Sequence, residues 1–305
     1  MMSTISDIKF KCFINKLANF YFFVQNLSEW HFSNRKSHNV FWRKEIGPFS
    51  EKEELAIKQF KEIHLRYPLG KSYLGRYFFI EKDPWSSLEK HLPKKDFFAV
   101  KNIFSQLQDK FHLLWKKDRL LLLKWQKLLD KKLNDSLLKK PIIKTLEILF
   151  NTKPSVSFIK VNLLISSPKH IGGGVNIDKE NIFIDISRFP LEKVNIAMGV
   201  VWHETIHLCF QDQYFLSLLI KYFNGNQQKI NLVNEATISS IFPRGILGIK
   251  LLKNEPAHRL LSQISQKQTI QIIKLLEEYI ESKKSLDMNY LAKVAKILSA
   301  SSFLY

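Results

Sequence analysis

The sequence predicts a predominantly helical α+β protein. Three observations carry this prediction: a long helical periodicity over 95–134, strand-like runs between 156 and 186, and an apolar segment around 200–210 that contains two histidines. Helical and strand-like patterns therefore occupy different parts of the chain, which is typical of the α+β class. The simplest division is a helical N-terminal region over 1–150, followed by an α+β region over 151–305.

The composition describes a chain with an ample core and an excess of positive charge. Hydrophobic residues make up 45% of the 305 residues, and 47 Lys and Arg against 28 Asp and Glu give a net charge of +19. The lysines are scattered and accompany no nucleic-acid-binding motif. We therefore favour solvated helix faces as their role, without excluding nucleic acid as a partner. Oligomeric state is not readable from the sequence.

Two features bear on the compartment. The chain has two cysteines, which is too few for a disulfide framework. It has no run of about 18 uninterrupted apolar residues, the minimum for a membrane-spanning helix. Charged residues also interrupt the N-terminus, where a secretory leader would have an apolar core. We therefore expect a cytoplasmic protein without a transmembrane segment.

The first half of the N-terminal region is expected to contain two helices, a loop over 36–50 and one irregular stretch. Apolar residues at helical spacing predict a helix over 5–27. The sequence Ser-Glu-Lys-Glu at 50–53 is close to a capping box and begins a second helix. That helix should end near Tyr67-Pro68, because proline disfavours helical geometry in the residue before it. The Pro, Gly and aromatic residues of 68–94 predict irregular structure.

The strongest helical pattern covers 95–134. There Phe, Leu, Ile and Trp recur at helical spacing while Lys fills the other face, in one long helix or in two. A further helix is expected from Pro141 to Phe150. These elements complete the predicted N-terminal region.

The pattern changes to that of strands after residue 155. Val156–Ile165 predicts a strand, and Val175–Ile177 with Ile182–Ile186 predicts a hairpin. The Gly-Gly-Gly sequence at 172–174 is expected to form a flexible turn ahead of this hairpin. A small sheet is therefore expected directly before the apolar segment around 200–210.

The most informative segment is Val200–Cys209, which contains the pattern His-Glu-x-x-His within apolar surroundings. On a helix, His203 and His207 are one turn apart and point the same way, so both imidazoles can bind one zinc ion. Glu204 is turned away from this pair and is placed to reach a metal-bound water. The helix is expected to run from Pro190 to Phe215. The alternative is a core helix whose histidines only form hydrogen bonds.

A zinc site of this kind needs a third protein ligand. A third histidine at position 213 is excluded, because the chain has Gln213 there. Asp212 follows the second histidine closely but is expected to be solvated or capping. Glu235 is the best candidate, because it is the single carboxylate in the mostly uncharged segment Asn231–Ser240. The alternative for Glu235 is a surface position at a loose helix start.

The remainder of the chain is expected to be helical. The helix with Glu235 should stop at Pro243, since proline breaks the helical hydrogen-bond pattern. Two C-terminal helices are predicted over 256–283 and 286–304.

Two histidines on one helix and a glutamate on a later one, introduced by Asn-Glu-Ala at 234–236, resemble the gluzincin clan of zinc metallopeptidases. The thermolysin-like enzymes are the best-known members. The resemblance covers about 181–241 and implies a zincin-like fold for that region. It also implies that His203, His207 and Glu235 are zinc ligands and that Glu204 is the general base and acid.

One position departs from the pattern of this clan. Such families often carry an Asp four residues after the ligand Glu, where it orients a ligand histidine, and this chain has Ser239 there. A partner for the outer ring nitrogen is still expected, because ligand histidines usually donate that N–H. Ser239, Thr237 or a backbone carbonyl can serve.

The resemblance implies a zinc-dependent metallopeptidase that hydrolyses peptide bonds in a peptide or protein substrate. Glu204 would take a proton from the attacking water and pass it to the leaving amine. The oxyanion would need one more donor, for which His258 and Tyr214 are the first candidates and Tyr222 and Arg244 the others. In zincin-like folds a strand beside the metal helix commonly pairs with an extended substrate, although a structural hairpin is an equal alternative.

Two other function classes stay open. The first is a basic helical binding protein on an inactive zincin scaffold, with nucleic acid as its partner. The intact set of His203, Glu204, His207 and Glu235 disfavours it, because an inactive scaffold has no need of the general base. The second is a structural helical protein with a chance motif, which predicts no stoichiometric metal.

Overall fold

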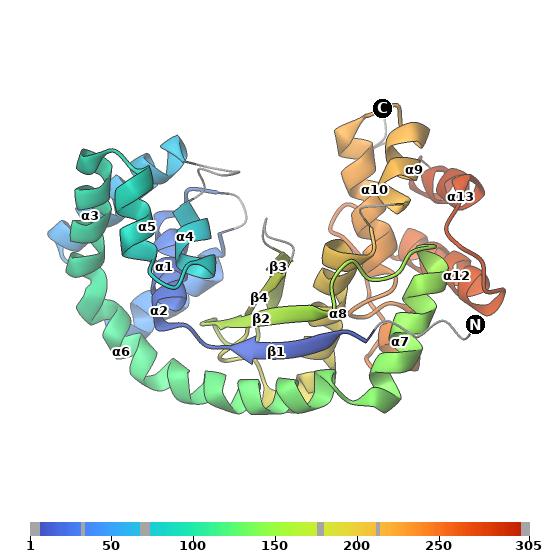
Figure 1. Ribbon diagram of the computed structural model, residues 1–305, viewed down its shortest axis with the longest axis horizontal. Helices are drawn as coiled ribbons and strands as arrows, with labels where there is room; N and C mark the ends of the chain where they lie inside the picture. The colour runs from blue at the N-terminus through green and yellow to red at the C-terminus, as the bar shows by residue number, and fades with distance from the viewer. Residues whose placement is uncertain (1–6, 32–33, 68–73, 176–179, 212–213, 300–305) are drawn as a thin grey trace.

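The computed structural model describes residues 7–31, 34–67, 74–175, 180–211 and 214–299, and these form a predominantly helical α+β fold with one small sheet, as predicted (Figure 1). The described helices and strands, in chain order, are β1 (Lys9–Phe13), α1 (Lys16–Ser28), α2 (Lys36–Ile46), α3 (Glu51–Arg66), α4 (Leu74–Ile80), α5 (Pro84–His91), α6 (Lys94–Leu133), α7 (Ser136–Leu149), β2 (Phe158–Leu164), β3 (Gly172–Val175), β4 (Asn181–Asp185), the 3₁₀ turn η2 (Leu191–Lys193), α8 (Val194–Cys209), α9 (Phe215–Tyr222), α10 (Gln227–Ser239), α11 (Ile246–Lys250), α12 (Gln266–Glu281) and α13 (Met288–Ser299).

The described strands form one mixed sheet in the order β1-β2-β4-β3. β1 pairs with β2 and β2 with β4 in parallel, while β3 pairs antiparallel with β4 and forms one edge. β1 belongs to residues 1–150, so the sheet joins that region to residues 151–305. In Figure 1 the helices α1–α5 lie at one end of the sheet and α9–α13 at the other, with α6 passing beneath it.

The predicted helix over 5–27 is wrong in its first part, where the chain forms β1. Phe10 and Cys12 are buried while their neighbours in the strand are exposed, which is the two-residue period of a strand. The helix α1 begins only after Asn15, whose side chain accepts hydrogen bonds from the backbone N–H groups of Leu17 and Ala18. The apolar residues of both elements together imitate one long helical pattern.

The loop predicted over 36–50 and the irregular structure predicted for 68–94 are also wrong where the structure describes them, because 36–46, 74–80 and 84–91 are helical. The side chain of Asp83 caps α5, and Pro84 occupies the first turn, where a missing N–H costs nothing. These start signals are present in the sequence. Aromatic packing, such as the stacked rings of Phe78 and Phe104 at 5.0 Å, supplies the rest of the stability.

Several predictions are confirmed with shifted boundaries. The capping box at Ser50 and Glu53 is present, and 94–133 is one continuous helix. The strand predicted over 156–165 is β2. α7 begins at Ser136, with Pro141 inside it.

Helix α8 ends at Cys209, short of the predicted Phe215, and α9 follows it. The helix with Glu235, α10, ends at Ser239, ahead of Pro243. The C-terminal helices begin at Gln266 and Met288, while residues 300–304 lie outside the described part of the chain.

The Gly-Gly-Gly sequence at 172–174 is the main surprise of the sheet. It was predicted to be a turn and is instead the edge strand β3, in which Gly172 lies opposite Asp185 and Gly174 opposite Phe183. A hairpin with β4 is therefore present, but its first strand is this glycine run. Of the predicted strand 175–177, only Val175 lies among the described residues.

The helix α8 is fixed against the sheet by its apolar side. The ring of Trp202 meets that of Phe10 on β1 edge to face at 5.1 Å, and it stacks on Phe242 at 6.3 Å. His203 and His207 lie on a different side of α8 from this packed ring of Trp202. Within the described residues, no helix has both the length and the apolar character that crossing a bilayer requires.

Candidate metal centre

Helices α8 and α10 bring the three predicted metal ligands together. The Nε2 atoms of His203 and His207 lie 3.1 Å apart. The carboxylate of Glu235 reaches both of them, with Oε1 at 3.1 Å from His207 Nε2 and Oε2 at 3.6 Å from His203 Nε2. We call His203, His207 and Glu235 the first cluster. Its donor atoms converge as the ligands of a single ion do.

The outer nitrogen of each imidazole faces an oxygen atom. His203 Nδ1 lies 3.1 Å from the carbonyl oxygen of Phe242, and His207 Nδ1 lies 2.8 Å from Oε1 of Gln211. The same Gln211 oxygen accepts a hydrogen bond from Nδ2 of Asn234, at 2.9 Å. Asn234 directly precedes Glu235, so the residue beside the third ligand also positions the partner of the second.

These oxygen partners determine where the ring protons lie. The backbone carbonyl of Phe242 can only accept, so Nδ1 of His203 carries a hydrogen. With the Gln211 amide assigned so that Oε1 faces the ring, Nδ1 of His207 carries one too. In the neutral imidazoles, the Nε2 lone pairs then point at one another and at the carboxylate of Glu235. Three electron-pair donors this close repel unless a cation lies between them, so the arrangement fits a metal ion.

The electrostatics of the first cluster agree with a cation site. Burial would lower the pKa of His203, but the carboxylates of Glu235 and Glu204 outweigh this and raise it. Burial would likewise raise the pKa of Glu235, yet His203 and His207 hold it well below its usual range. Without a metal the cluster thus attracts a proton, and a divalent cation takes that place in a zinc site.

Glu204 lies beside this cluster with only 8% of its surface exposed. Burial, more than any neighbouring charge, raises the pKa of its carboxyl group. The carboxylate lies directly against β3, because a Cβ atom on Gly173 would come within 2.7 Å of Glu204 Oε1. Only glycine allows this approach of the strand to α8. The buried carboxylate is therefore placed between the strand and the metal ligands.

A second group of two imidazoles and a carboxylate was not predicted. His38 from α2 and His170 from the segment after β2 place their Nε2 atoms 2.8 and 2.9 Å from Oδ2 of Asp185, at the end of β4. We call His38, His170 and Asp185 the second cluster. Their spacing also falls in the range of a metal site.

The outer nitrogen of His38 gives the second cluster a different character. His38 Nδ1 accepts a hydrogen bond from the backbone N–H of Ser167 at 3.1 Å, so in the neutral ring the proton lies on Nε2. That proton is donated to Asp185 at 2.8 Å. Burial lowers the pKa of His38, which favours this neutral form, and the close contacts with His170 and His38 hold the pKa of Asp185 at about 2 despite its burial. The contact is a hydrogen bond, and no lone pair of His38 is left for a metal.

The candidates for the oxyanion donor are not joined to the first cluster. His258 is exposed between α11 and α12, and Tyr214 lies at the N-terminal end of α9. Arg244 and Tyr222 also form no described contact with the metal-ligating residues. Asp212 lies outside the described residues.

Several residues of the site were missed from the sequence. Gln211 follows His207 by four residues, and this helical spacing would have revealed it. The carbonyl of Phe242 is one of the three kinds of partner expected, whereas the Thr237 hydroxyl donates to Val233 and accepts from Tyr290 instead. The second cluster gathers residues from three separate segments, so no local sequence pattern indicates it.

Comparison of the chain with family models, with curated proteins and with solved structures found no match.

Proposed function

We propose that this protein is a zinc-dependent metallopeptidase with a zincin-like catalytic region. The observation that carries the proposal is the arrangement of His203, His207 and Glu235, whose Nε2 and carboxylate atoms converge while both outer nitrogens are held by oxygen acceptors. Two imidazoles and one carboxylate form a common protein ligand set of catalytic zinc, which keeps one position for water.

Zinc held by these three residues would supply a Lewis acid for the carbonyl group and lower the pKa of a bound water toward neutrality. The protein's own contribution begins with Glu204. Its raised pKa places the carboxylate closer to the range in which a general base also returns the proton as an acid. Glu204 accepts the proton from the attacking water and delivers it to the leaving amine nitrogen, so that the carboxylate is regenerated.

Gly173, Gln211 and the Phe242 carbonyl are the positioning groups of this mechanism. Gly173 lets the edge strand lie against Glu204, and the two oxygen atoms fix the rings of His207 and His203. Rigid support of this kind is what keeps a catalytic constellation in its productive geometry.

The proposal is tested by metal removal and return. The purified full chain is stripped with a chelator, reconstituted with zinc, and incubated with a mixed peptide library whose new N-termini are read by mass spectrometry. We expect new termini only with zinc-loaded protein. A parallel sample given Mg²⁺ controls for general effects of divalent cations, since Mg²⁺ prefers oxygen ligands.

Hydrolysis that persists after complete zinc removal would contradict the proposal. Stoichiometric zinc without any hydrolysis would instead favour a binding protein on an inactive zincin scaffold. A location in the cytoplasm stays a prediction from the sequence.

A further inference from the structure

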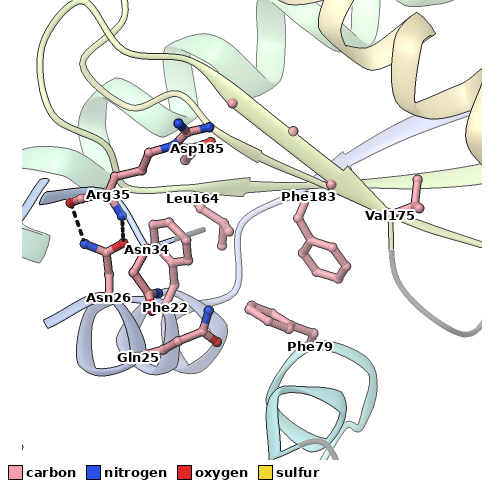
Figure 2. A pocket seen from close by; sticks show the side chains of 13 residues that line it. Phe22, Gln25, Asn26, Asn34, Arg35, Phe79, Leu164, Val175, Phe183 and Asp185 are labelled. Atoms are coloured by element: carbon pink, nitrogen blue, oxygen red, sulfur yellow. Dashed lines mark hydrogen bonds between the residues drawn. The ribbon is translucent and has the colours of Figure 1, made fainter. Parts of the chain in front are cut away.

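A cavity of about 350 Å³ lies against β3 and β4 (Figure 2). It is on the face of β3 away from Glu204, because Gly173 faces Glu204 whereas Gly174 lies opposite Phe183, which lines the cavity. Its walls are the half-buried rings of Phe22 on α1, Phe79 on α4 and Phe183 on β4, and its rim includes the glycines of β3. Figure 2 shows Phe79 and Phe183 facing one another, with their ring centroids 4.4 Å apart. The cavity has the size of a site for one large side chain.

The backbone groups at the two edges of the sheet differ in whether side chains form hydrogen bonds with them. At the β1 edge, side chains of α6 satisfy the backbone: Asn134 bonds both the N–H and the C=O of Phe10, Asp130 accepts from the N–H of Cys12, and Gln126 donates to the Cys12 carbonyl. At the β3 edge, no described residue outside the β4 ladder forms a hydrogen bond with 172–175. An open edge beside a candidate catalytic carboxylate is suited to pairing with an extended peptide.

The three glycines of β3 also differ in what surrounds them. A Cβ atom on Gly172 would come within 2.6 Å of Asp185 Oδ1, and one on Gly173 within 2.7 Å of Glu204 Oε1. A Cβ atom on Gly174 would meet nothing within 4 Å. Packing within the chain therefore explains the first two glycines and leaves the third without an internal cause. Gly174 lines the cavity, opposite Phe183.

The register connects the cavity to the candidate catalytic site. Residues directly opposite one another on neighbouring strands place their side chains on the same face of a sheet. A peptide residue opposite Gly173 would therefore face Glu204, and its neighbour opposite Gly174 would point to the side of Phe183, into the cavity. Successive residues of one extended peptide would thus reach the two sites in turn.

The chemistry of the walls selects the side chain. Three phenyl rings offer apolar contact and edge-to-face partners. The lining contains one carboxylate, that of Asp185, and one guanidinium, that of Arg35, so it is neutral although the chain carries +19. Asp185 is already bonded to His38 and His170. The backbone of Arg35 is held by Asn26, through bonds of 2.8 and 3.0 Å (Figure 2). The lining therefore carries no net charge, and its three phenyl rings are the apolar surface that a large side chain would contact.

We propose that substrates of this protein add as a strand to β3 and insert an aromatic side chain into the cavity between Phe22, Phe79 and Phe183, next in sequence to the residue that faces Glu204. This inference rests on the proposed peptidase function, because it takes the bound peptide to be a substrate. The binding mode itself can be tested without turnover.

The test uses fluorescently labelled ten-residue peptides that differ at one central position, occupied by Phe, Tyr, Leu, Ala, Arg or Glu. Their affinities are measured by anisotropy on the zinc-loaded Glu204→Gln variant, and the cleavage positions are mapped with the wild type. We expect the Phe and Tyr peptides to bind about tenfold or more tightly than the Ala peptide, as burial of a ring predicts. The wild type should cleave beside the aromatic residue.

Two further variants locate the preference. Gly174→Val in the Glu204→Gln background adds a side chain at the rim of the cavity, where a Cβ atom meets nothing within 4 Å, and Phe79→Ala removes one wall. Both should abolish the preference for Phe over Ala. Phe98→Ala, which removes a 60% exposed ring of α6 outside the cavity, should leave the preference intact. Thermal unfolding of each variant confirms that it is folded.

Each outcome has a defined meaning. Equal affinities for all six peptides, tightest binding of Arg or Glu, an unchanged preference in Gly174→Val and Phe79→Ala, or no binding at all would overturn the pocket. If the wild type cleaves nothing while the Phe preference and its loss are observed, the pocket stands and the peptidase function fails. If the wild type cleaves without regard to aromatic residues, the peptidase function stands and the pocket fails.

Discussion

Two clusters in this protein have the same composition, two imidazoles and one carboxylate, and opposite chemistry. In the first cluster, the outer nitrogens of His203 and His207 face oxygen acceptors, so the lone pairs of their inner nitrogens converge. In the second, the outer nitrogen of His38 accepts a backbone N–H, so its inner nitrogen donates a proton to Asp185. The hydrogen-bond partner of each outer ring nitrogen decides whether the inner nitrogen offers a lone pair to a metal or a proton to a carboxylate. The spacing of the ligand atoms alone does not distinguish the two cases.

The surroundings of the two clusters differ in the same sense. His38 is fully buried and Asp185 is 9% exposed, and the pair joins α2 to the end of β4. The Glu235 side chain of the first cluster is 43% exposed, and Glu204, the proposed general base, lies beside the cluster with a pKa raised by burial. A closed hydrogen-bonded pair stabilises the junction of two regions, whereas a reactive site needs access for water and substrate.

The largest expected effect is the loss of the general base. Glu204→Gln should reduce turnover on the order of 10³-fold, since an amide cannot accept the proton of water. Zinc content, measured by elemental analysis, should stay at the wild-type level because Glu204 is not a ligand. His38→Gln at the second cluster should keep both turnover and zinc under conditions where it is folded. Full turnover in Glu204→Gln would remove the general base from the mechanism.

A smaller effect is expected from the strand that supports the base. Gly173→Ala forces a Cβ atom to within 2.7 Å of Glu204 Oε1, so the carboxylate or the strand must move. Displacements of this size cost about 10²-fold in turnover. Steady-state kinetics with a circular-dichroism spectrum separate this loss from unfolding. Gly174→Ala is the matched control for stability, because its Cβ atom meets nothing within 4 Å. Equal turnover in Gly173→Ala and wild type would show that Glu204 does not act in this position.

The next effect concerns Gln211, whose Oε1 is the hydrogen-bond partner of His207 Nδ1. Gln211→Ala removes the acceptor that orients this ring, and loss of such a partner typically weakens metal affinity about 10- to 100-fold. Competition with a fluorescent zinc chelator measures the affinity. Gln227→Ala, on the exposed start of α10, is the control and should leave it unchanged. An unaltered affinity in Gln211→Ala would break the explanation offered for the difference between the clusters.

The smallest effect is a pH dependence at the second cluster. Burial lowers the pKa of His38 below its usual value of 6.5, so the unfolded chain takes up a proton before the folded one does. Stability from this group is therefore present above pH 6.5 and is lost as the pH falls through the folded pKa. Between pH 7 and 5, the unfolding free energy of the wild type should fall more steeply than that of His38→Gln in urea titrations. Parallel profiles would mean that His38 is already protonated in the fold.

The first cluster was largely predictable from the sequence, and the reason is local geometry. His203 and His207 lie on one helix turn, so their spacing alone determines their juxtaposition. Glu235 stood out as the single carboxylate of its segment, and the structure places it against both rings. The class of the fold followed equally from periodicity.

What escaped prediction depends on tertiary contacts. Residues 9–13 form a strand only because β2 accepts them as a partner, and their apolar residues merge with the pattern of α1. The glycines of β3 form a strand against their own propensity, and at Gly172 and Gly173 the side chains of Asp185 and Glu204 occupy the space where a Cβ atom would lie. The second cluster brings His38 together with Asp185, 147 positions later in the chain, and no local pattern encodes a contact over that separation.

The most direct test of the difference between the two clusters is the zinc content per chain of the wild type, His203→Ala and His38→Ala, each reconstituted and freed of excess metal. The account predicts one zinc in the wild type, none in His203→Ala, and one in His38→Ala. Two zinc ions in the wild type with one lost in His38→Ala would show that the second cluster is also a metal site. No zinc in the wild type would contradict the metal centre itself.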